Sequence, residues 1–294
     1  MQKKLALITF GGDNMQAHIY KIECLTNMHV GSGEVNYNII DNEVQKDPVL
    51  QIPTINSSSL KGALRAHFEQ LDEEKKLDDN LISYVFGSKN SNEQKDTSEG
   101  KYKFLSGNMI SKPARISRTT GNYSYANITT PSMINQMISL LNALNISTLN
   151  GTSIPVPSNF ELSIPDKSFY VYDDKIKYIE GVKTTTSNNS NKEELDKNIK
   201  FLKFLLGDNF AICTDAMFSF IDLPVIARNQ LDNGISKNLW YEEIVPHKSI
   251  FYFALLTPSS DDKIVKFNVL LNQVVQIGAN ASIGYGVTKI TKIS

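Results

Sequence analysis

The residues with the greatest chemical potential lie between His29 and Arg65. A glycine-rich turn, His29-Val-Gly-Ser-Gly33, is followed by the loop acid Asp41 and then by Ser57-Ser-Ser-Leu-Lys-Gly-Ala-Leu-Arg65, which has the pattern of a helix start. Glycines let a backbone approach a polyanion closely, and the first turn of a helix offers unpaired N–H groups to phosphate. We therefore predict a surface that grips a nucleic-acid backbone, with an acid and a histidine nearby that could do chemistry on it.

Basic side chains in two segments are the candidate phosphate ligands. Lys61 and Arg65 are one helical turn apart, so they would add positive charge to one helix face. Arg115 and Arg118 lie in a second basic segment. Solvated surface charge is the alternative interpretation of each of these four residues.

Composition is typical of an ordinary globular protein. The chain has 294 residues, 41% of them hydrophobic and 21% charged, with a formal net charge of −1. Basic residues grouped on one face would still allow nucleic-acid binding. No Walker A, paired CxxC, HExxH or GxSxG motif is present, which weighs against nucleotide hydrolysis, structural zinc and α/β-hydrolase chemistry.

The sequence favours a cytoplasmic protein without a membrane segment. Cys24 and Cys213 lie in apolar stretches without metal-ligand spacing, and buried free thiols suit a reducing compartment. No apolar run approaches the roughly 18 residues of a membrane span. Residues 1–14 lack a signal-peptidase pattern, and we treat them as an extension of unknown role.

The hydrophobic periodicity alternates between helices and strands. Apolar spacing and caps predict helices over 60–71, 131–149 and 193–206. Alternating or β-branched runs predict strands over 18–24, 225–228, 239–245, 250–256 and 264–269. The sequence Asp232-Asn-Gly234 is typical of a tight β-hairpin turn and lies between the strands predicted over 225–228 and 239–245. The mixed order predicts an α+β fold with an antiparallel sheet.

Two segments have the composition of loops. Residues 34–54 have little helical period, and an unstructured loop of that length is often functional. Residues 87–101 are polar and of low complexity, so we expect a flexible surface loop there.

Three later motifs, together with the first segment, carry a family resemblance. They are Pro113-Ala-Arg-Ile-Ser-Arg118 with Gly121 and Thr129-Thr-Pro131; Leu223-Pro-Val-Ile-Ala-Arg228 with Leu239-Trp-Tyr-Glu-Glu-Ile-Val-Pro246; and Ile277-Gly-Ala-Asn-Ala-Ser-Ile-Gly-Tyr-Gly286. In this order they resemble the repeating backbone subunit of the type III-B (Cmr) CRISPR complex, a member of the RAMP superfamily. The resemblance runs from about Met15 to the C-terminus.

The resemblance implies a fold and a set of partners. The fold would be a ferredoxin-like, RRM-related palm with inserted loops and a β-hairpin thumb over about 225–247, all within one RAMP domain spanning 15–294. The partners would be a CRISPR guide RNA, a complementary single-stranded target RNA, copies of the chain in a head-to-tail filament and other type III-B subunits.

The implied reaction is endonucleolytic cleavage of target RNA at regular intervals. The resemblance gives Asp41 as the catalytic acid, and a divalent cation, Mg²⁺ or Mn²⁺, bound by Asp41 would assist without any organic cofactor. The residues alone favour the other interpretation of Asp41, a solvated loop acid or an Asx-turn residue. Glu43 and Asp47 are its nearby competitors.

His29 and Glu242 complete the predicted catalytic set. The near-neutral titration of histidine suits proton transfer, and shaping of the loop is the other role open to His29. The resemblance implies that one hairpin glutamate, with Glu242 preferred to Glu243, holds the ion or positions the attack. The alternative interpretation is a pair of edge-strand acids. The family often has a tyrosine where this chain has Ile244, so this chain lacks that hydroxyl.

The resemblance also extends the predicted RNA-binding set from the first glycine turn to the glycines of the C-terminal loop. The complete set is Gly31, Ser32, Gly33, Ser59, Lys61, Arg65, Arg115, Arg118, Gly278, Gly284 and Gly286. Two other functions remain open at this point: a non-catalytic structural backbone subunit that binds guide RNA, and a free-standing endoribonuclease that processes CRISPR transcripts.

Overall fold

A thirteen-stranded mixed sheet organises the protein. The computed structural model describes residues 7–33, 39–75, 79–88, 98–119, 124–151, 153–186, 189–271 and 273–294. The strands of the large sheet are β1 (Leu7–Phe10), β2 (Asp13–Cys24), β3 (Thr54–Ile55), β4 (Lys103–Phe104), β5 (Gly107–Thr119), β6 (Tyr125–Thr129), β9 (Phe169–Val171), β10 (Ile176–Ile179), β11 (Val182–Thr185), β12 (Phe210–Cys213), β15 (Ile250–Pro258), β16 (Val274–Gln276) and β17 (Val287–Lys292).

The centre of this sheet is antiparallel. β15 pairs with β2 along its whole length, and β17 flanks β2 on the other side. Every residue of β15 up to Thr257 is buried, because neighbouring strands flank it and the core covers it. β2 begins earlier than the sequence predicted but buries the expected side chains His18, Tyr20, Ile22 and Cys24.

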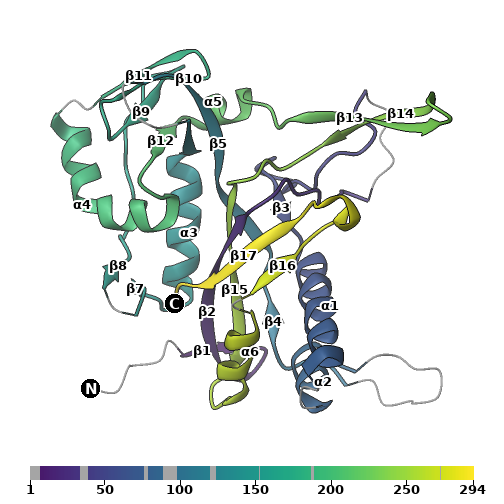
Figure 1. Ribbon diagram of the computed structural model, residues 1–294. Coiled ribbons are helices and arrows are strands. Elements are labelled where there is room, and N and C mark those ends of the chain that lie inside the picture. Colours follow the sequence, from purple (N-terminus) through teal and green to yellow (C-terminus); the bar gives the residue numbers. More distant parts are fainter. Residues whose placement is uncertain are drawn as a thin grey trace.

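β5 joins this centre to a second group of strands. Its first residues pair with β15, its middle with β6 and its end with β10. β12 runs parallel to β6 and antiparallel to β9. Figure 1 shows this second group at the upper left, away from the central strands.

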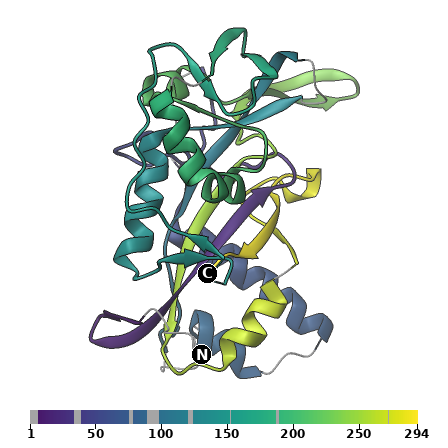
Figure 2. The same cartoon turned by 90° about the vertical axis from the view of Figure 1, so that its left-hand side faces the viewer.

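Helices cover the sheet in two groups. Within the described residues the helices are α1 (Ser57–Lys75), α2 (Asp79–Phe86), α3 (Pro131–Ala143), α4 (Asn189–Leu206), α5 (Asp215–Phe220), α6 (Lys263–Leu271) and the short 3₁₀ helix η1 (Ala281–Ile283). Figures 1 and 2 show α1, α2 and α6 together below the central strands, and α3 and α4 beside the second group. The predicted α+β class is confirmed, but the sheet expected to be antiparallel is mixed, because β12 runs parallel to β6 and β11 runs parallel to β9.

An aromatic cluster holds the first group of helices together. Phe68 of α1 stacks on Phe267 of α6 with ring centroids 4.9 Å apart and meets Phe86 of α2 edge-on. Phe86 in turn stacks on Phe104 of β4. The apolar residues that recur at helical spacing from Leu60 to Leu71 therefore form the face of α1 that packs into this cluster.

A two-stranded hairpin projects from the body of the protein. β13 (Val225–Asp232) pairs with β14 (Ile235–Glu243), and their tip is closed by Asn233 and Gly234, both with positive φ. This is the turn that the sequence predicted. Figures 1 and 2 show the hairpin extending beyond the sheet. A smaller hairpin, β7 (Thr148–Leu149) with β8 (Ile154–Pro155), lies near α3.

The N-terminal segment contributes a strand to the sheet edge. β1 pairs with the first residues of β2, from Leu7 opposite Gln16 to Phe10 opposite Asp13. Residues 7–10 thus form a β-hairpin with the start of β2, whereas residues 1–6 lie outside the described part of the chain. Most of the loop predicted over 87–101 also lies outside it, since the described residues there are 87–88 and 98–101.

Two predicted elements were wrong in type or extent. Residues 264–269 lie in the helix α6, because Phe267, Leu270 and Leu271 are buried at helical spacing while the β-branched Val265 and Val269 face outward. The helix predicted over 131–149 ends at Ala143, after which Asn145 adopts positive φ and the chain turns into β7.

Both cysteine thiols are free and buried, as the sequence predicted. Burial raises the pKa of each, Cys24 and Cys213, to about 12. None of the described helices is both long enough and apolar enough to cross a membrane.

The glycine-rich loop before β17 gives a prediction about packing. Gly278 and Gly284 have similar φ angles of 91° and 81°, but a Cβ atom on Gly278 would lie 2.3 Å from the carbonyl oxygen of His29, whereas one on Gly284 would meet nothing within 4 Å. Replacing either by alanine should cost about 1 kcal/mol in backbone strain. Gly278→Ala should lose about 1–3 kcal/mol more than Gly284→Ala through the clash, as measured by denaturant unfolding. Equal losses would contradict this packing.

Candidate active site

Four segments that are distant in the sequence meet at the root of the β13–β14 hairpin. Isolated bridges join Met28 to Val245, Gly31 to Val44 and Asn42 to Glu242. The C-terminal glycine-rich loop closes the group, because Ala279 N donates to the carbonyl oxygen of His29 at 2.8 Å. The structure therefore brings together the first glycine turn, the acid loop, the end of β14 and the C-terminal loop.

Asp41 is exposed, and the end of β14 fixes its position. Its Oδ2 accepts a hydrogen bond from Tyr241 N at 2.8 Å, and its own N donates to Tyr241 O at 3.0 Å. An acid held by main-chain contacts at the surface is available to a ligand. The competitors differ from it, because Asp47 Oδ1 accepts from Val49 N and Leu50 N within its own turn, and Glu43 is half-buried.

His29 is buried, and its tautomer is set by the backbone. The residue is 5% exposed, and Nδ1 donates to Glu243 O at 2.8 Å. A carbonyl oxygen can accept but never donate, so Nδ1 carries a proton, and in the neutral form of the ring the lone pair lies on Nε2. That nitrogen faces Gly31, where a Cβ atom would lie 3.2 Å from it.

Glu242 lies at the root of the hairpin, and both of its carboxylate oxygens accept hydrogen bonds. Oε2 accepts from Arg228 Nε and Nη2 at 3.1 and 2.9 Å, and Oε1 accepts from Asn280 Nδ2 at 2.7 Å. The Arg228 guanidinium also lies 4.6 Å from the centre of the Tyr285 ring. Glu242 thus ties the hairpin to the C-terminal loop, and its predicted part in the chemistry stays a prediction.

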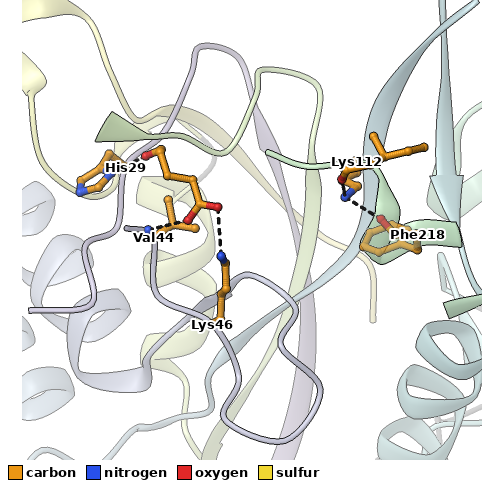
Figure 3. A network of polar contacts seen from close by, with 7 residues as sticks. His29, Val44, Lys46, Lys112 and Phe218 are labelled. Atoms are coloured by element: carbon orange, nitrogen blue, oxygen red, sulfur yellow. Dashed lines mark hydrogen bonds and ion pairs between the residues drawn. The ribbon is translucent and has the colours of Figure 1, made fainter. Parts of the chain in front are cut away.

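Sequence reasoning missed the contacts of the neighbouring Glu243. Its Oε1 accepts from Lys46 Nζ at 3.0 Å and its Oε2 from Val44 N at 3.1 Å (Figure 3). The glutamate is 6% exposed. Nothing local marks Lys46 in the sequence, because its partner is 197 residues away.

Lys112 is a second buried charge that the sequence did not reveal. Its Nζ donates to Phe218 O at 3.0 Å and to Ile221 O, and it lies 4.2 Å from the centre of the Phe218 ring (Figure 3). These carbonyls belong to the end of α5, which leads into β13. Burial lowers the pKa of Lys112 to about 8.

The predicted phosphate contacts fall into separate places. Gly31 and Gly33 are exposed beside the acid loop, and Ser32 N between them donates to Glu43 O at 3.2 Å. Ser59 is exposed in the first turn of α1.

The basic candidates lie on two elements. Lys61 and Arg65 are half-buried on α1, where Arg65 Nε donates to Glu69 Oε1 at 2.9 Å. Arg115 and Arg118 lie toward the far end of β5, in the part that pairs with β6 and β10, and Arg115 Nη2 is 3.6 Å from Glu180 Oε2.

The three C-terminal glycines have different surroundings. Gly278 packs against the backbone of His29, and a Cβ atom on Gly286 would lie 2.0 Å from the carbonyl oxygen of Ile277. Gly284 has open space around it and is the most accessible of the three to a ligand. Two of these positions therefore have a packing reason to be glycine, apart from any contact with RNA.

Comparison with known proteins places the whole arrangement in a family. The model of the RAMP superfamily matches residues 21–289, which include all four segments of the site. The chain belongs to the RAMP superfamily. The sequence-based prediction of this family is confirmed.

Within the RAMP superfamily the chain is a homologue of Cmr4 over nearly its full length. It is 24% identical to the CRISPR system Cmr endoribonuclease Cmr4 of Pyrococcus furiosus, over 94% of this chain and 96% of that one. It is 25% identical to the CRISPR system CMR subunit Cmr4 of Saccharolobus solfataricus, over 92% and 94%.

Solved RAMP structures share the fold. A chain of the type III-B Cmr-beta complex bound to cognate target RNA superposes with a TM-score of 0.70 at 22% identity, covering 94% of this chain and 96% of that chain. Oligomeric Cmr4 from Pyrococcus furiosus gives a TM-score of 0.64 at 21% identity, with 94% and 97% coverage. The α+β architecture is therefore that of this family.

The buried amine of Lys112 at the end of α5 predicts a pH effect on stability. With the folded-state pKa of Lys112 near 8 and an ordinary value of 10.5 when unfolded, the unfolded chain binds one more proton between these pH values. The unfolding free energy of the wild type, relative to Lys112→Met, should therefore rise from pH 8 to pH 10, by up to about 1.4 kcal/mol per pH unit.

Denaturant titrations at several pH values measure this difference, with the exposed Lys177→Met as the matched control. A wild-type to Lys112→Met difference that stays constant across this range would show that Lys112 remains charged in the folded protein.

Proposed function

We propose that this chain is the repeated backbone subunit of a type III-B CRISPR complex, and that it binds guide RNA and cleaves complementary target RNA with Asp41. The observation that carries the proposal is the exposed Asp41, fixed by the end of β14 in a chain that is a full-length homologue of Cmr4. Guide–target pairing would supply the sequence specificity, while contacts from the protein read the backbone.

Different parts of the fold would bind the guide RNA and present the target RNA to Asp41. The central strands with α1 would form the ferredoxin-like palm that holds guide phosphates, and β13–β14 would be the thumb. Leu231, Ile235 and Leu239 on the hairpin are 62%, 68% and 53% exposed. Exposed apolar side chains on a projecting finger suit insertion between bases, and such an insertion would splay a target nucleotide toward Asp41.

The proposed reaction is an attack within the target RNA. The 2′-oxygen forms a bond to the adjacent phosphorus while the bond from phosphorus to the 5′-oxygen breaks, leaving a cyclic phosphate and a 5′-hydroxyl. Asp41 orients the 2′-hydroxyl or takes its proton, and water returns a proton to the leaving oxygen. Because DNA lacks the 2′-hydroxyl, this route explains selectivity for RNA. The lone pair on His29 Nε2 is the second candidate acceptor.

The carboxylate of Asp41 also fits the predicted divalent cation. The described residues contain no cluster of three or more His, Cys, Asp or Glu side chains that could hold a metal by themselves. Mg²⁺ is commonly bound through one or two carboxylates together with substrate phosphates and water, so a single exposed acid is sufficient. Bound there, the ion would offset charge on the reacting phosphate.

Assembly would follow from a head-to-tail contact between copies. Such a contact uses two different surfaces of the chain, so it propagates along the guide RNA and places one Asp41 at each repeat. Regularly spaced cleavage is the expected consequence. A structural subunit without activity would assemble in the same way. Only a measurement of cleavage therefore distinguishes a catalytic from a non-catalytic backbone subunit.

Replacing the acid tests the catalytic proposal. In the assembled complex, Asp41→Asn should lower the rate of target cleavage by at least about 100-fold while guide-RNA affinity is preserved, because the side chain serves the chemistry and leaves the core intact. Single-turnover cleavage of labelled target and a filter-binding titration measure the two quantities. Addition of EDTA should stop wild-type cleavage in the same assay.

Matched variants of the neighbouring acids act as controls. Asp47→Asn and Glu43→Gln should retain cleavage, since Asp47 serves its own turn. Wild-type cleavage by Asp41→Asn would reject it as the catalytic acid, and unchanged cleavage in EDTA would remove the cation from the mechanism.

The basic face of α1 gives a separate prediction on binding. Lys61→Ala combined with Arg65→Ala should weaken guide-RNA binding to the same extent for any guide sequence, because phosphate contacts carry no base information. Each lost contact should flatten the log–log salt dependence of the binding constant by about 0.7. Titrations at several salt concentrations measure this slope, and an unchanged slope would mean that these side chains do not touch the RNA.

A further inference from the structure

Glu243 connects three segments of the candidate site through four polar contacts. Its carboxylate accepts from Lys46 Nζ and Val44 N, its backbone N donates to Asn42 O at 2.9 Å, and its backbone O accepts from His29 Nδ1. The first three contacts go to the loop that carries Asp41. The fourth fixes the imidazole.

Alternation along β14 separates the tasks of the two glutamates. Adjacent residues of a strand point to opposite faces, so the carboxylate of Glu242 reaches Arg228 and Asn280 while that of Glu243 reaches the acid loop. Glu242 therefore joins the hairpin to the C-terminal loop. Glu243 joins the hairpin to the loop of Asp41.

Both sides of the acid loop have main-chain contacts, and one side also has a side-chain contact. Asp41 is paired with the main chain of Tyr241. On the other side, Val44 bridges to Gly31, and the carboxylate of Glu243 adds contacts with Val44 N and Lys46 Nζ. The glutamate is 6% exposed, and its contacts with Lys46 and Val44 N are charge-assisted. Loss of the carboxylate would leave Val44 N without this acceptor and Lys46 Nζ without its counter-ion, so the loop should loosen.

We propose that Glu243, paired with Lys46, is the positioning residue of the site: it holds the loop so that Asp41 stands at the root of the hairpin. This inference rests on the proposed function, because it assigns Glu243 to the cleavage that Asp41 would perform. The glutamate acts through the loop and touches no RNA, so it should affect the rate of cleavage rather than the binding of substrate.

The test compares Glu243→Ala, Glu243→Gln, Lys46→Met and Lys46→Arg in the assembled complex, with the exposed Asp208→Asn as the control. Glu243→Ala should lower the single-turnover cleavage rate by about 10- to 100-fold, since misplacing a reactive group by about 1 Å costs this much. The Kd for target RNA should change less than about twofold. The cleavage rate of Glu243→Gln should lie between those of the wild type and Glu243→Ala, because the amide oxygen can still accept from Val44 N.

Variants of the partner distinguish positioning from a loss of fold. Lys46→Arg should restore most of the activity lost in Lys46→Met, because it restores the cation. The double variant Lys46→Met with Glu243→Ala should cleave no more slowly than Glu243→Ala alone, because both changes remove the same contact between Lys46 and Glu243. If the double variant instead lost cleavage rate by the product of the two single losses, the proposed pairing of Lys46 with Glu243 would be overturned.

Hydrogen exchange provides a readout that needs no cleavage. Peptides covering residues 39–50 should exchange faster in Glu243→Ala and Glu243→Gln, with the larger change in Glu243→Ala, and the central β15 should be unaffected. Wild-type exchange of the loop, or wild-type cleavage despite a loosened loop, would each overturn the proposal. If the wild-type complex shows no cleavage at all, the proposed function fails, and loop exchange alone decides whether Glu243 holds the loop.

Discussion

The alternation of side chains along β14 is the constraint on which the site depends. Because Glu242 and Glu243 are neighbours in a strand, one must reach the C-terminal loop and the other the loop of Asp41. The root of a single strand thereby joins segments from both ends of the chain. A shift of one residue in this register would exchange the two faces and separate all of them.

Buried charge is concentrated where the hairpin meets the sheet. Glu242, Glu243 and Lys112 are almost fully buried there, and each is paired with specific partners. Paired buried charges are costly to disturb, because removal of one member leaves the other without compensation. The far end of the hairpin, by contrast, is exposed: the exposed apolar side chains of Leu231 and Ile235 flank the polar turn at 232–234. The hairpin therefore has a firmly held root and an exposed far end.

Local patterns predicted the elements that local physics determines. Alternation located β2, the apolar period located α1, and the Asn-Gly turn located the hairpin. The strand predicted over 264–269 was wrong. The β-branched residues there favour a strand, but packing of Phe267 against Phe68 required a helix.

The candidate site was predicted in part. Ordered motifs identified His29, Asp41 and Glu242, which do meet in space. Lys46 and Lys112 had no signal, because their partners are 197 and 106 residues away and include main-chain carbonyls that no sequence pattern marks. The distinct surroundings of Gly278 and Gly284 were equally invisible, since only the approach of the His29 backbone separates them.

The two buried thiols have a practical consequence for spectroscopy. Cys24 and Cys213 are the two cysteines of the chain, and both are enclosed by the core with their pKa raised to about 12. Thiol-directed dyes react with exposed thiolates, so the native protein should give little background labelling. A single cysteine introduced at the exposed Ser236 would thus carry a fluorophore on the hairpin tip without any need to remove the natural ones.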